Sequence, residues 1–287
     1  MRRYLRKIKI IYISFILVIV FNLGGCAQIE SETIASIDIS DDIEFKYTQE
    51  DLRVYPNADA QTINLDGMDT DLLISNGGDY ILSGSFEHSI IIDANEYVVH
   101  LFLDNVSVKS VTDNALIALS ASKIIITCVE NSNNSFEDGE YYENNKEYDA
   151  CIYSVPDLTF NGSGELYIKG IYEDAIHSKD ILKISGCKLE VQSKGDSLRG
   201  NDGISIVNAN VSCEAEKDGL RTSKNGAGVK GNIVIKETEL SVIAGQNAIE
   251  AYDRLVICGS KVYLYGIYEN ILSNNGAYIE EGNIINE

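Results

Sequence analysis

Tryptophan is absent from this chain of 287 residues, which also has only two prolines and three histidines. With so few histidines and no Cys-x-x-Cys pair, a zinc site is not expected. Basic residues are scarce as well, because 23 Lys and Arg face 44 Asp and Glu, for a formal net charge of −21. Such an acidic chain repels phosphates, so we expect no nucleic-acid partner and an affinity for cations. The hydrophobic content of 45% excludes a wholly disordered chain.

The first 25 residues have the layout of an export signal. Five basic residues and no acidic residue precede an apolar run of about 14 residues. That run is shorter than a helix that spans a bilayer. The run ends in Leu23-Gly-Gly-Cys26, which resembles a bacterial lipobox. We therefore predict a signal peptide over 1–25 and lipidation of Cys26, which would hold the protein on the extracellular face of the bacterial cell membrane by its lipid alone. The alternative is an ordinary signal peptide, or an anchoring helix, with a chance cysteine.

Residues 26–57 are acidic and contain few large apolar side chains. This composition predicts that residues 26–57 form a tether between the lipid and a folded domain over 58–287. Once Cys26 is lipidated, five of the six cysteines remain, and an odd number cannot all pair within one chain. We expect these cysteines to be small buried hydrophobic residues, with disulfides as the alternative.

The folded region contains a repeat of about 22 residues. Asp174, Asp196 and Asp218 fall at equal intervals, and apolar residues recur with them. Each unit holds two runs of alternating apolar residues and a short third one, separated by Gly, Asn, Asp and Ser, which is typical of short strands and turns. A leucine-rich repeat has a similar period but only one strand per unit. The pattern predicts an all-β fold, a right-handed single-stranded parallel β-helix with about 22 residues per coil, whose coils are stable only when stacked.

The alternation also predicts which side chains form the core. The inward-facing positions of the repeat are Ile176, Leu182, Ile184, Leu189, Leu198, Ile204, Ile206, Val211, Leu220, Ile233 and Leu255. The segment 130–148 is rich in polar residues, and we expect it to leave the coil as a long loop.

Several motifs recur at spacings that are characteristic of a known family. They are Asn134-Ser-Phe-Glu-Asp-Gly139, Asp157-Leu-Thr-Phe-Asn-Gly-Ser-Gly164, Asp174-Ala-Ile-His-Ser-Lys-Asp180, Asn201-Asp-Gly-Ile204 and Asp218-Gly-Leu220. From about Tyr80 to Gly266 the chain thus resembles a family of bacterial cell-surface carbohydrate-binding β-helix proteins. The resemblance implies a fold similar to pectate lyases, bound calcium, and binding of polygalacturonate and cellulose. The chain departs from the usual Asp-Gly at residues 174, 196, 247 and 270.

Stacking of the repeat places carboxylates in two columns. Like charges about 5 Å apart repel one another unless something neutralises them. Because Ca²⁺ prefers oxygen ligands, we predict structural calcium at these columns. An aspartate at a coil corner can instead accept hydrogen bonds from backbone N–H groups of the turn, and this alternative stays open. The predicted metal-binding residues are Asp174, Asp180, Asp196, Asp202 and Asp218.

A row of cations runs beside the first column. His177, Arg199 and Arg221 share one repeat position, three residues after each aspartate, and are expected to face solvent if the neighbouring apolar residues face the core. Arginine pairs well with carboxylates, so the row is a candidate site for uronate groups. The alternative is a row of salt bridges to neighbouring acids.

Sugar rings usually stack on flat aromatic side chains, here called sugar platforms, and in a chain without tryptophan tyrosines are the candidates. Tyr167 and Tyr263 occupy equivalent outward positions, and Tyr172 belongs to a Gly-Ile-Tyr-Glu motif that occurs twice. Tyrosine is also common on exposed strands for its β-propensity alone.

The sequence shows no recognisable nucleophile–base pair. We therefore interpret the chain as a noncatalytic, monomeric binder of an acidic polysaccharide that is stabilised by calcium. Two alternatives are kept: a pectate-lyase-like polysaccharide lyase that uses an arginine as its base, and a structural or adhesive surface protein with a protein partner.

Overall fold

The computed structural model describes residues 35–36, 43, 45–142 and 148–284. The predicted signal peptide, Cys26 and most of the tether lie outside the described residues, so these predictions stay predictions. Within the described ranges, no helix is long and apolar enough to cross a membrane.

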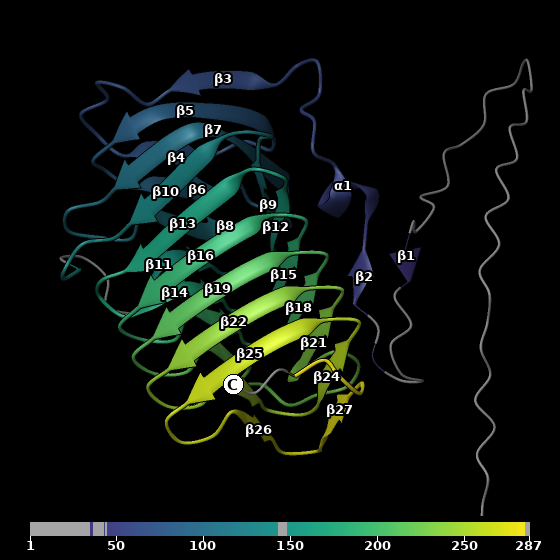
Figure 1. The fold of residues 1–287 in the computed structure, drawn as a ribbon. Helices are drawn as coiled ribbons and strands as arrows, with labels where there is room; N and C mark the ends of the chain where they lie inside the picture. Colours follow the sequence, from purple (N-terminus) through teal and green to yellow (C-terminus); the bar gives the residue numbers. More distant parts are fainter. Residues whose placement is uncertain (1–34, 37–42, 44, 143–147, 285–287) are drawn as a thin grey trace, which may run out of the picture. The chain divides into compact units, whose positions relative to one another are not determined.

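Three series of parallel strands wind around one core, and each coil from β8 to β25 contributes one strand to each series (Figure 1). The first series is β4 (Leu72–Ile74), β6 (Ile90–Asp93), β8 (Leu116–Ser120), β11 (Ala150–Ser154), β14 (Asp174–Ser178), β17 (Leu198–Gly200), β20 (Leu220–Arg221), β23 (Ile249–Ala251) and β26 (Ile271–Ser273). The second is β9 (Lys123–Cys128), β12 (Leu158–Gly162), β15 (Ile181–Ser185), β18 (Gly203–Val207), β21 (Asn232–Lys236), β24 (Leu255–Cys258) and β27 (Ala277–Ile279). The third is β3 (Gln61–Asn64), β5 (Gly78–Phe86), β7 (Val98–Lys109), β10 (Asn133–Glu137), β13 (Glu165–Gly170), β16 (Lys188–Ser193), β19 (Asn210–Ala215), β22 (Glu239–Ala244) and β25 (Lys261–Gly266).

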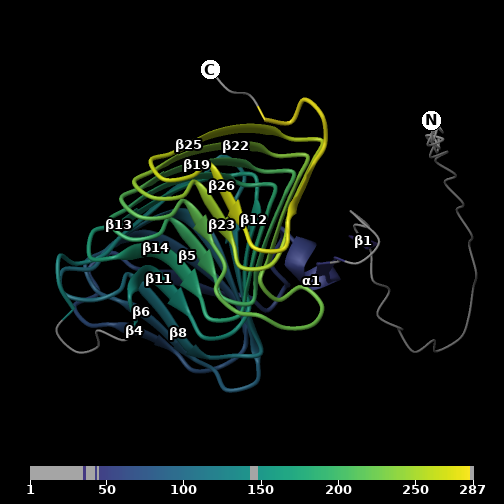
Figure 2. The ribbon, with the colours of Figure 1, turned by 90° about the horizontal axis from the view of Figure 1, so that it is seen from below.

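The long strand β7 joins the second and third series into one sheet, since its first half pairs with β9 and its second half with β10. Seen from below, the coils lie one behind another around the interior (Figure 2). This is a nearly all-β fold with parallel sheets, consistent with the predicted β-helix.

The strand phase predicted from the repeat is confirmed. Every residue of the predicted core is buried, none of them more than 1% exposed. Equivalent residues pair from coil to coil, as Ile176 does with Leu198 and Leu198 with Leu220. The interior is therefore built from columns of like apolar side chains, each covered by the next coil. Cys128, Cys151, Cys187 and Cys213 are buried as free thiols, as expected, and Cys258 is a half-buried free thiol.

Segment 130–148 differs from the expected loop, because it contains the strand β10. Phe136 is fully buried, and the Asn134 side chain accepts the backbone N–H of Val106 at 2.9 Å. Polar residues thus occupy positions that the pattern of apolar residues alone would not assign to a strand.

The C-terminal part of the acidic tether packs against the domain. We call Ile43 and residues 45–53 the N-terminal strap; it includes β2 (Lys46–Tyr47), which pairs with β1 (Ala35–Ser36), and α1 (Gln49–Leu52). The strap crosses the outer face of the second series, and α1 lies beside β12 (Figure 1). Its buried apolar side chains pack against residues of β18, β21 and β24: Ile43, Phe45 and Tyr47 meet Val207, Val234 and Val256.

Asp51 fixes the strap electrostatically. Its side chain is fully buried and forms ion pairs with Lys123 at 2.9 Å and Lys183 at 3.3 Å. Burial raises the pKa of this carboxyl, but Lys183, the backbone N–H of Thr48 and Lys123 outweigh it and lower the pKa to about 2. Removing either lysine would leave the buried carboxylate poorly compensated, so this pairing makes detachment of the strap costly.

Candidate functional site

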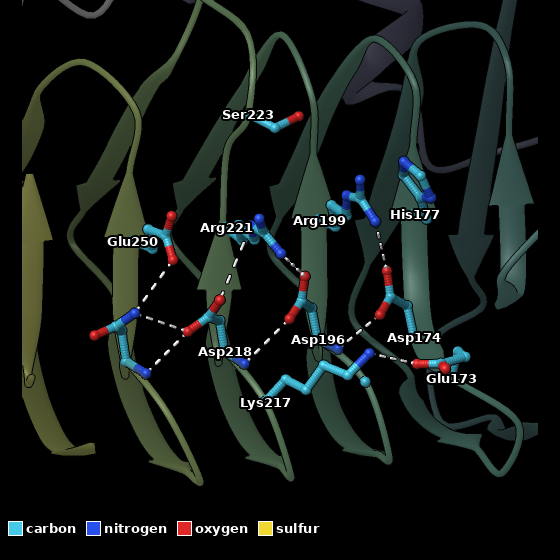
Figure 3. Close-up of polar contacts among 12 residues, drawn as sticks. Glu173, Asp174, His177, Asp196, Arg199, Lys217, Asp218, Arg221, Ser223 and Glu250 are labelled. Carbon is cyan, nitrogen blue, oxygen red and sulfur yellow. Dashed lines mark hydrogen bonds and ion pairs between the residues drawn. The ribbon is translucent and has the colours of Figure 1, made fainter. Parts of the chain in front are cut away.

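Asp174, Asp196 and Asp218, here called the aspartate ladder, lie at the corner that leads into the first series (Figure 3). The Oδ1 atom of Asp174 accepts the backbone N–H of Asp196 at 2.7 Å, 22 residues further along the chain. The Oδ1 atom of Asp196 accepts the N–H of Asp218 at 3.1 Å. The Oδ1 atom of Asp218 accepts the N–H of Asn247 at 2.9 Å. Each carboxylate therefore joins two successive coils, as the corner hydrogen-bonding interpretation expects.

The other carboxylate oxygens of the ladder face arginines. Arg199 Nη1 lies 3.3 Å from Asp174 Oδ2, and Arg221 Nη1 lies 3.4 Å from Asp196 Oδ2. Each arginine thus contacts the aspartate of the preceding coil. Arg221 Nε also lies 3.9 Å from Asp218 Oδ2. The ladder carries alternating charges, and the arginines relieve part of the repulsion between its carboxylates.

Burial nevertheless affects the ionisation of the ladder. It raises the pKa of Asp174 to about 7, and the charge of Asp196 acts in the same direction. Burial raises the pKa of Asp196 as well, although Arg221 opposes it. Asp174 is therefore partly protonated near neutral pH, which lowers the charge of the column.

His177, Arg199 and Arg221, here called the cationic row, do not all face solvent as expected. The arginine side chains are 24% and 35% exposed, but His177 is only 4% exposed. The His177 ring packs edge-on against Tyr153 at 5.0 Å, and its Nδ1 atom lies 2.6 Å from Asp149 Oδ1. The expectation that His177 faces solvent was wrong because neighbouring side chains of the preceding coil cover it.

Asp149, Asp174 and His177 bring three possible ligand atoms within 4.8 Å of one another. Among the described residues this is the group whose geometry comes nearest to a metal site. Two carboxylates and one imidazole suit a transition metal better than Ca²⁺, which prefers six to eight oxygen ligands. Sequence reasoning missed Asp149 because it lies outside the clearest part of the repeat.

The second predicted metal column has a different environment. Burial raises the pKa of Asp180 to about 6, helped by the charges of Asp157 and Asp202. Asp202 forms ion pairs with Lys224 at 2.8 Å and Lys230 at 2.7 Å. Both lysines belong to the longer coil between β20 and β21, so the extra residues that interrupt the repeat supply cations to this column.

The predicted tyrosine platforms are dispersed. Tyr167 and Tyr263 lie in one column on the outer face of the third series, in β13 and β25, with three strands between them. The hydroxyl of Tyr167 donates to Gln192 Oε1 at 2.9 Å. Tyr172 lies at the corner after β13, where its ring stacks on Tyr142 at 4.3 Å. The three rings therefore do not form one continuous surface.

A groove on the same outer face escaped sequence reasoning. It has a volume of about 790 Å³ and follows the edge where the third series ends. One wall is a column of paired residues, one from each of five adjacent strands: Lys169, Gln192, Glu214, Ile243 and Tyr265. The floor consists of small residues, Gly170, Ser193, Ala215 and Ala244. The opposite wall consists of turn residues, Ile171, Lys194, Glu216, Gly245 and Ile267.

The polarity of the groove changes along its length. The end formed by β13 and β16, here called the early end, is polar and contains Lys169, Lys194 and Gln192. The end formed by β22 and β25, here called the late end, is apolar and open to solvent, because Ile243, Tyr265 and Ile267 are 54%, 63% and 65% exposed. Large apolar side chains gathered on a soluble surface mark a binding site more often than scattered ones do.

The fold defines a β-helix-like protein of stacked parallel strands, and a groove lies on the outer face of its third series. A family model described as "Carbohydrate-binding domain-containing protein" matches residues 68–281. That match covers well over half of the chain, so the chain belongs to this carbohydrate-binding family.

Two individual proteins are similar to the chain. A protein of Acetivibrio thermocellus, also described as a carbohydrate-binding domain-containing protein, is 26% identical over 179 residues, which are 59% of this chain and 59% of the relative. The chain thus spans less than two thirds of that relative's length. A solved structure described as the polysaccharide lyase-like protein from C. thermocellum, in a gadolinium derivative, has a TM-score of 0.72 and 23% identity, covering 78% of this chain and 98% of the other. At this identity the likeness concerns the fold.

Proposed function

We propose that the domain is a noncatalytic binder of polysaccharide. Membership of the carbohydrate-binding family supports the ligand class. The observation that carries the noncatalytic part is the pairing of the cationic row, since Arg199 and Arg221 each contact ladder carboxylates. The pKa of Arg221 is raised, because Asp196, Glu250 and Asp218 outweigh its burial. An arginine held in this way is a poor general base, because a base must first lose its proton.

We further propose that the preferred polymer is acidic and meets the cationic row. Arg199 and Arg221 remain partly exposed, and a guanidinium has five N–H donors, so both can bind a uronate while keeping their aspartate partners. The surrounding charge opposes such a ligand, because Asp149, Asp174 and Glu250 lie nearby. A bridging divalent cation would reduce that repulsion.

Calcium is the cation that the family resemblance implies, and the two columns fit it differently. In the aspartate ladder, Asp174 and Asp196 already use both oxygens, one on a backbone N–H and one on an arginine. These residues do not form a calcium cage without displacing the arginines. Asp180 fits better, because the charges of Asp157 and Asp202 help to raise its pKa and a cation would relieve that repulsion. Lys224 and Lys230 already pair with Asp202, and a cation shared with Asp202 would have to displace them. Calcium stabilisation at Asp180 and Asp202 belongs to the proposal on that condition.

The proposed cellular setting is the one expected from the leader. A monomer attached through lipidated Cys26 to the extracellular face of a bacterial membrane would present the domain to polysaccharides outside the cell. Palmitate labelling of the full chain in a bacterial host, compared with Cys26→Ser, tests the anchor. Equal labelling of both chains would contradict lipidation at Cys26.

Affinity electrophoresis tests the binding proposal directly. The domain is run through gels that contain polygalacturonate, a soluble neutral β-glucan or no polymer, with and without Ca²⁺. Retardation by polygalacturonate supports acidic-polymer binding, and retardation by the neutral polymer alone contradicts it. A rise in absorbance from unsaturated product would show lyase activity instead. Free migration in every gel, together with capture of a protein partner, would favour the adhesive alternative.

A further inference from the structure

We propose that the groove over β13, β16, β19, β22 and β25 binds a single polysaccharide chain along the stacking axis, with one sugar ring on Tyr265. This inference rests on the proposed function and assigns a second polysaccharide site, in addition to the cationic row proposed for acidic polymers. It differs from the cationic row, which lies on the outer face of the first series.

The direction of the groove follows from strand register. The wall residues pair from strand to strand, from Lys169 with Gln192 to Ile243 with Tyr265. Four steps between five parallel strands, at about 4.8 Å each, give a wall of about 19 Å. The strand spacing is close to the length of one pyranose ring in an extended chain. Successive rings of a bound chain would therefore meet equivalent positions on successive coils.

The late end of the groove has the chemistry of a sugar platform. Tyr265 is 63% exposed, and its neighbour in the column, Ile243, is 54% exposed. Ile267 lies on the opposite wall and is 65% exposed. An exposed tyrosine offers a flat apolar ring to the C–H face of a sugar and a hydroxyl to its edge. The two isoleucines would flank that ring and exclude water from it.

The polar end supplies hydrogen-bonding groups with little net charge. The lining contains Lys169 and Lys194 together with Glu140, Glu214 and Glu216. Two cations against three carboxylates give no strong attraction for a polyanion. Recognition would then depend on stacking and hydrogen bonds, so binding in the groove should change little with salt. Binding of a polyanion to the cationic row should weaken as salt rises.

The coil geometry by itself explains why glycine occurs in the lining of the groove. A Cβ on Gly170 would lie 2.5 Å from the carbonyl oxygen of Asp174, so the coil geometry itself requires a glycine. The small residues on the floor of the groove therefore do not indicate a ligand. The evidence for a ligand is the exposed apolar end combined with a groove of about 790 Å³ in a carbohydrate-binding family.

The test compares tyrosines of similar exposure. Tyr265→Ala removes the platform, Tyr265→Phe keeps the ring, and Tyr278→Ala removes a 55% exposed ring from β27 in the second series. Affinities for polygalacturonate and for a soluble neutral β-glucan are measured by affinity electrophoresis at low and high NaCl. We expect Tyr265→Ala to lose about tenfold in affinity for the polymer that wild type binds, while the other two variants stay near wild type. Ile243→Ser serves as a second groove variant, and thermal melting verifies that each variant is folded.

The outcomes separate this inference from the proposed function. If wild type binds a polymer and folded Tyr265→Ala and Ile243→Ser bind it equally well, the groove is not the site, although polysaccharide binding stands. Loss of affinity in Arg221→Gln but not in the groove variants would likewise place binding on the cationic row. If wild type binds neither polymer, both proposals fail. Groove binding also requires that the affinity for the neutral β-glucan change by less than about twofold between low and high salt.

Discussion

The outer faces of the first and third series are built from the same repeat but use it differently. On the first series, the repeated polar positions bond to one another: each ladder aspartate spans two coils, and an arginine of the next coil contacts each of Asp174 and Asp196 (Figure 3). On the third series, the repeated outward positions change from coil to coil, from Lys169 to Tyr265. A column that repeats the same residue along the chain joins the coils, whereas a column whose residues differ from coil to coil leaves side chains available to a ligand.

The ladder residue Asp196 provides the largest expected effect. In Asp196→Ala, the buried N–H of Asp218 loses its acceptor and Arg221 loses its nearest carboxylate. In Asp196→Asn, a side-chain oxygen can still accept that N–H, and the charge that burial disfavours is removed. We expect alanine to lower the free energy of unfolding by about 2 to 3 kcal/mol more than asparagine does. Urea unfolding of both variants measures this difference, and equal losses would contradict a hydrogen-bonding role for Asp196.

Calcium should stabilise the second column rather than the ladder. If Ca²⁺ binds only the folded state, a hundredfold excess over its dissociation constant adds about 2.7 kcal/mol to the free energy of unfolding. Mg²⁺ should do less, because it requires tight octahedral geometry and holds its water firmly. Melting of the domain in chelator, Ca²⁺ and Mg²⁺ measures the effect. Asp180→Asn should remove the calcium shift and Asp196→Asn should keep it, whereas equal melting temperatures in all three solutions would end the calcium proposal.

The ladder should also make stability depend on pH. Asp174 has a pKa of about 7 in the folded chain against 3.8 ordinarily, because burial and the charge of Asp196 disfavour its ionised form. Between these values the folded chain holds the proton more tightly than the unfolded chain. The free energy of unfolding contributed by this group is therefore highest below about pH 4 and falls as pH rises to about 7.

Replacing that carboxyl isolates its contribution. Asp174→Asn cannot ionise, yet it keeps an oxygen that can accept the N–H of Asp196. Between pH 5 and pH 8, wild type should lose about 2 kcal/mol more than this variant. Urea unfolding at the two pH values gives the comparison. Parallel pH profiles for the two chains would show that Asp174 titrates as an ordinary carboxyl.

The fold and the ladder could be predicted because the 22-residue repeat determines both. Once Ile176, Leu198 and Leu220 are assigned to the core, the stacking of Asp174 on Asp196 follows. The burial of His177 could not be predicted in the same way. It depends on Asp149 and Tyr153, which belong to an earlier coil where the repeat is looser.

The strap and the groove escaped prediction for related reasons. Asp51 meets Lys183 across more than a hundred positions of sequence, and no local pattern indicates such a pair. Tyr265 follows the outward period of its strand, but its exposure and its place in a groove depend on the turn residues beside it. A repeat indicates which residues stack, whereas the shape of the surface depends on where the repeat is broken.

The smallest expected effect comes from the varied column and completes the contrast with the ladder. Glu214 lies in the groove wall, is exposed, and accepts a long hydrogen bond of 3.4 Å from Gln192. Glu214→Ala should therefore change the free energy of unfolding by no more than about 0.5 kcal/mol, since exposed polar pairs contribute little. Urea unfolding beside Asp196→Ala measures it under the same conditions. A loss as large as that of the ladder variant would mean that the third-series face also holds the coils together, and that its variation along the groove does not mark a surface left free for ligand.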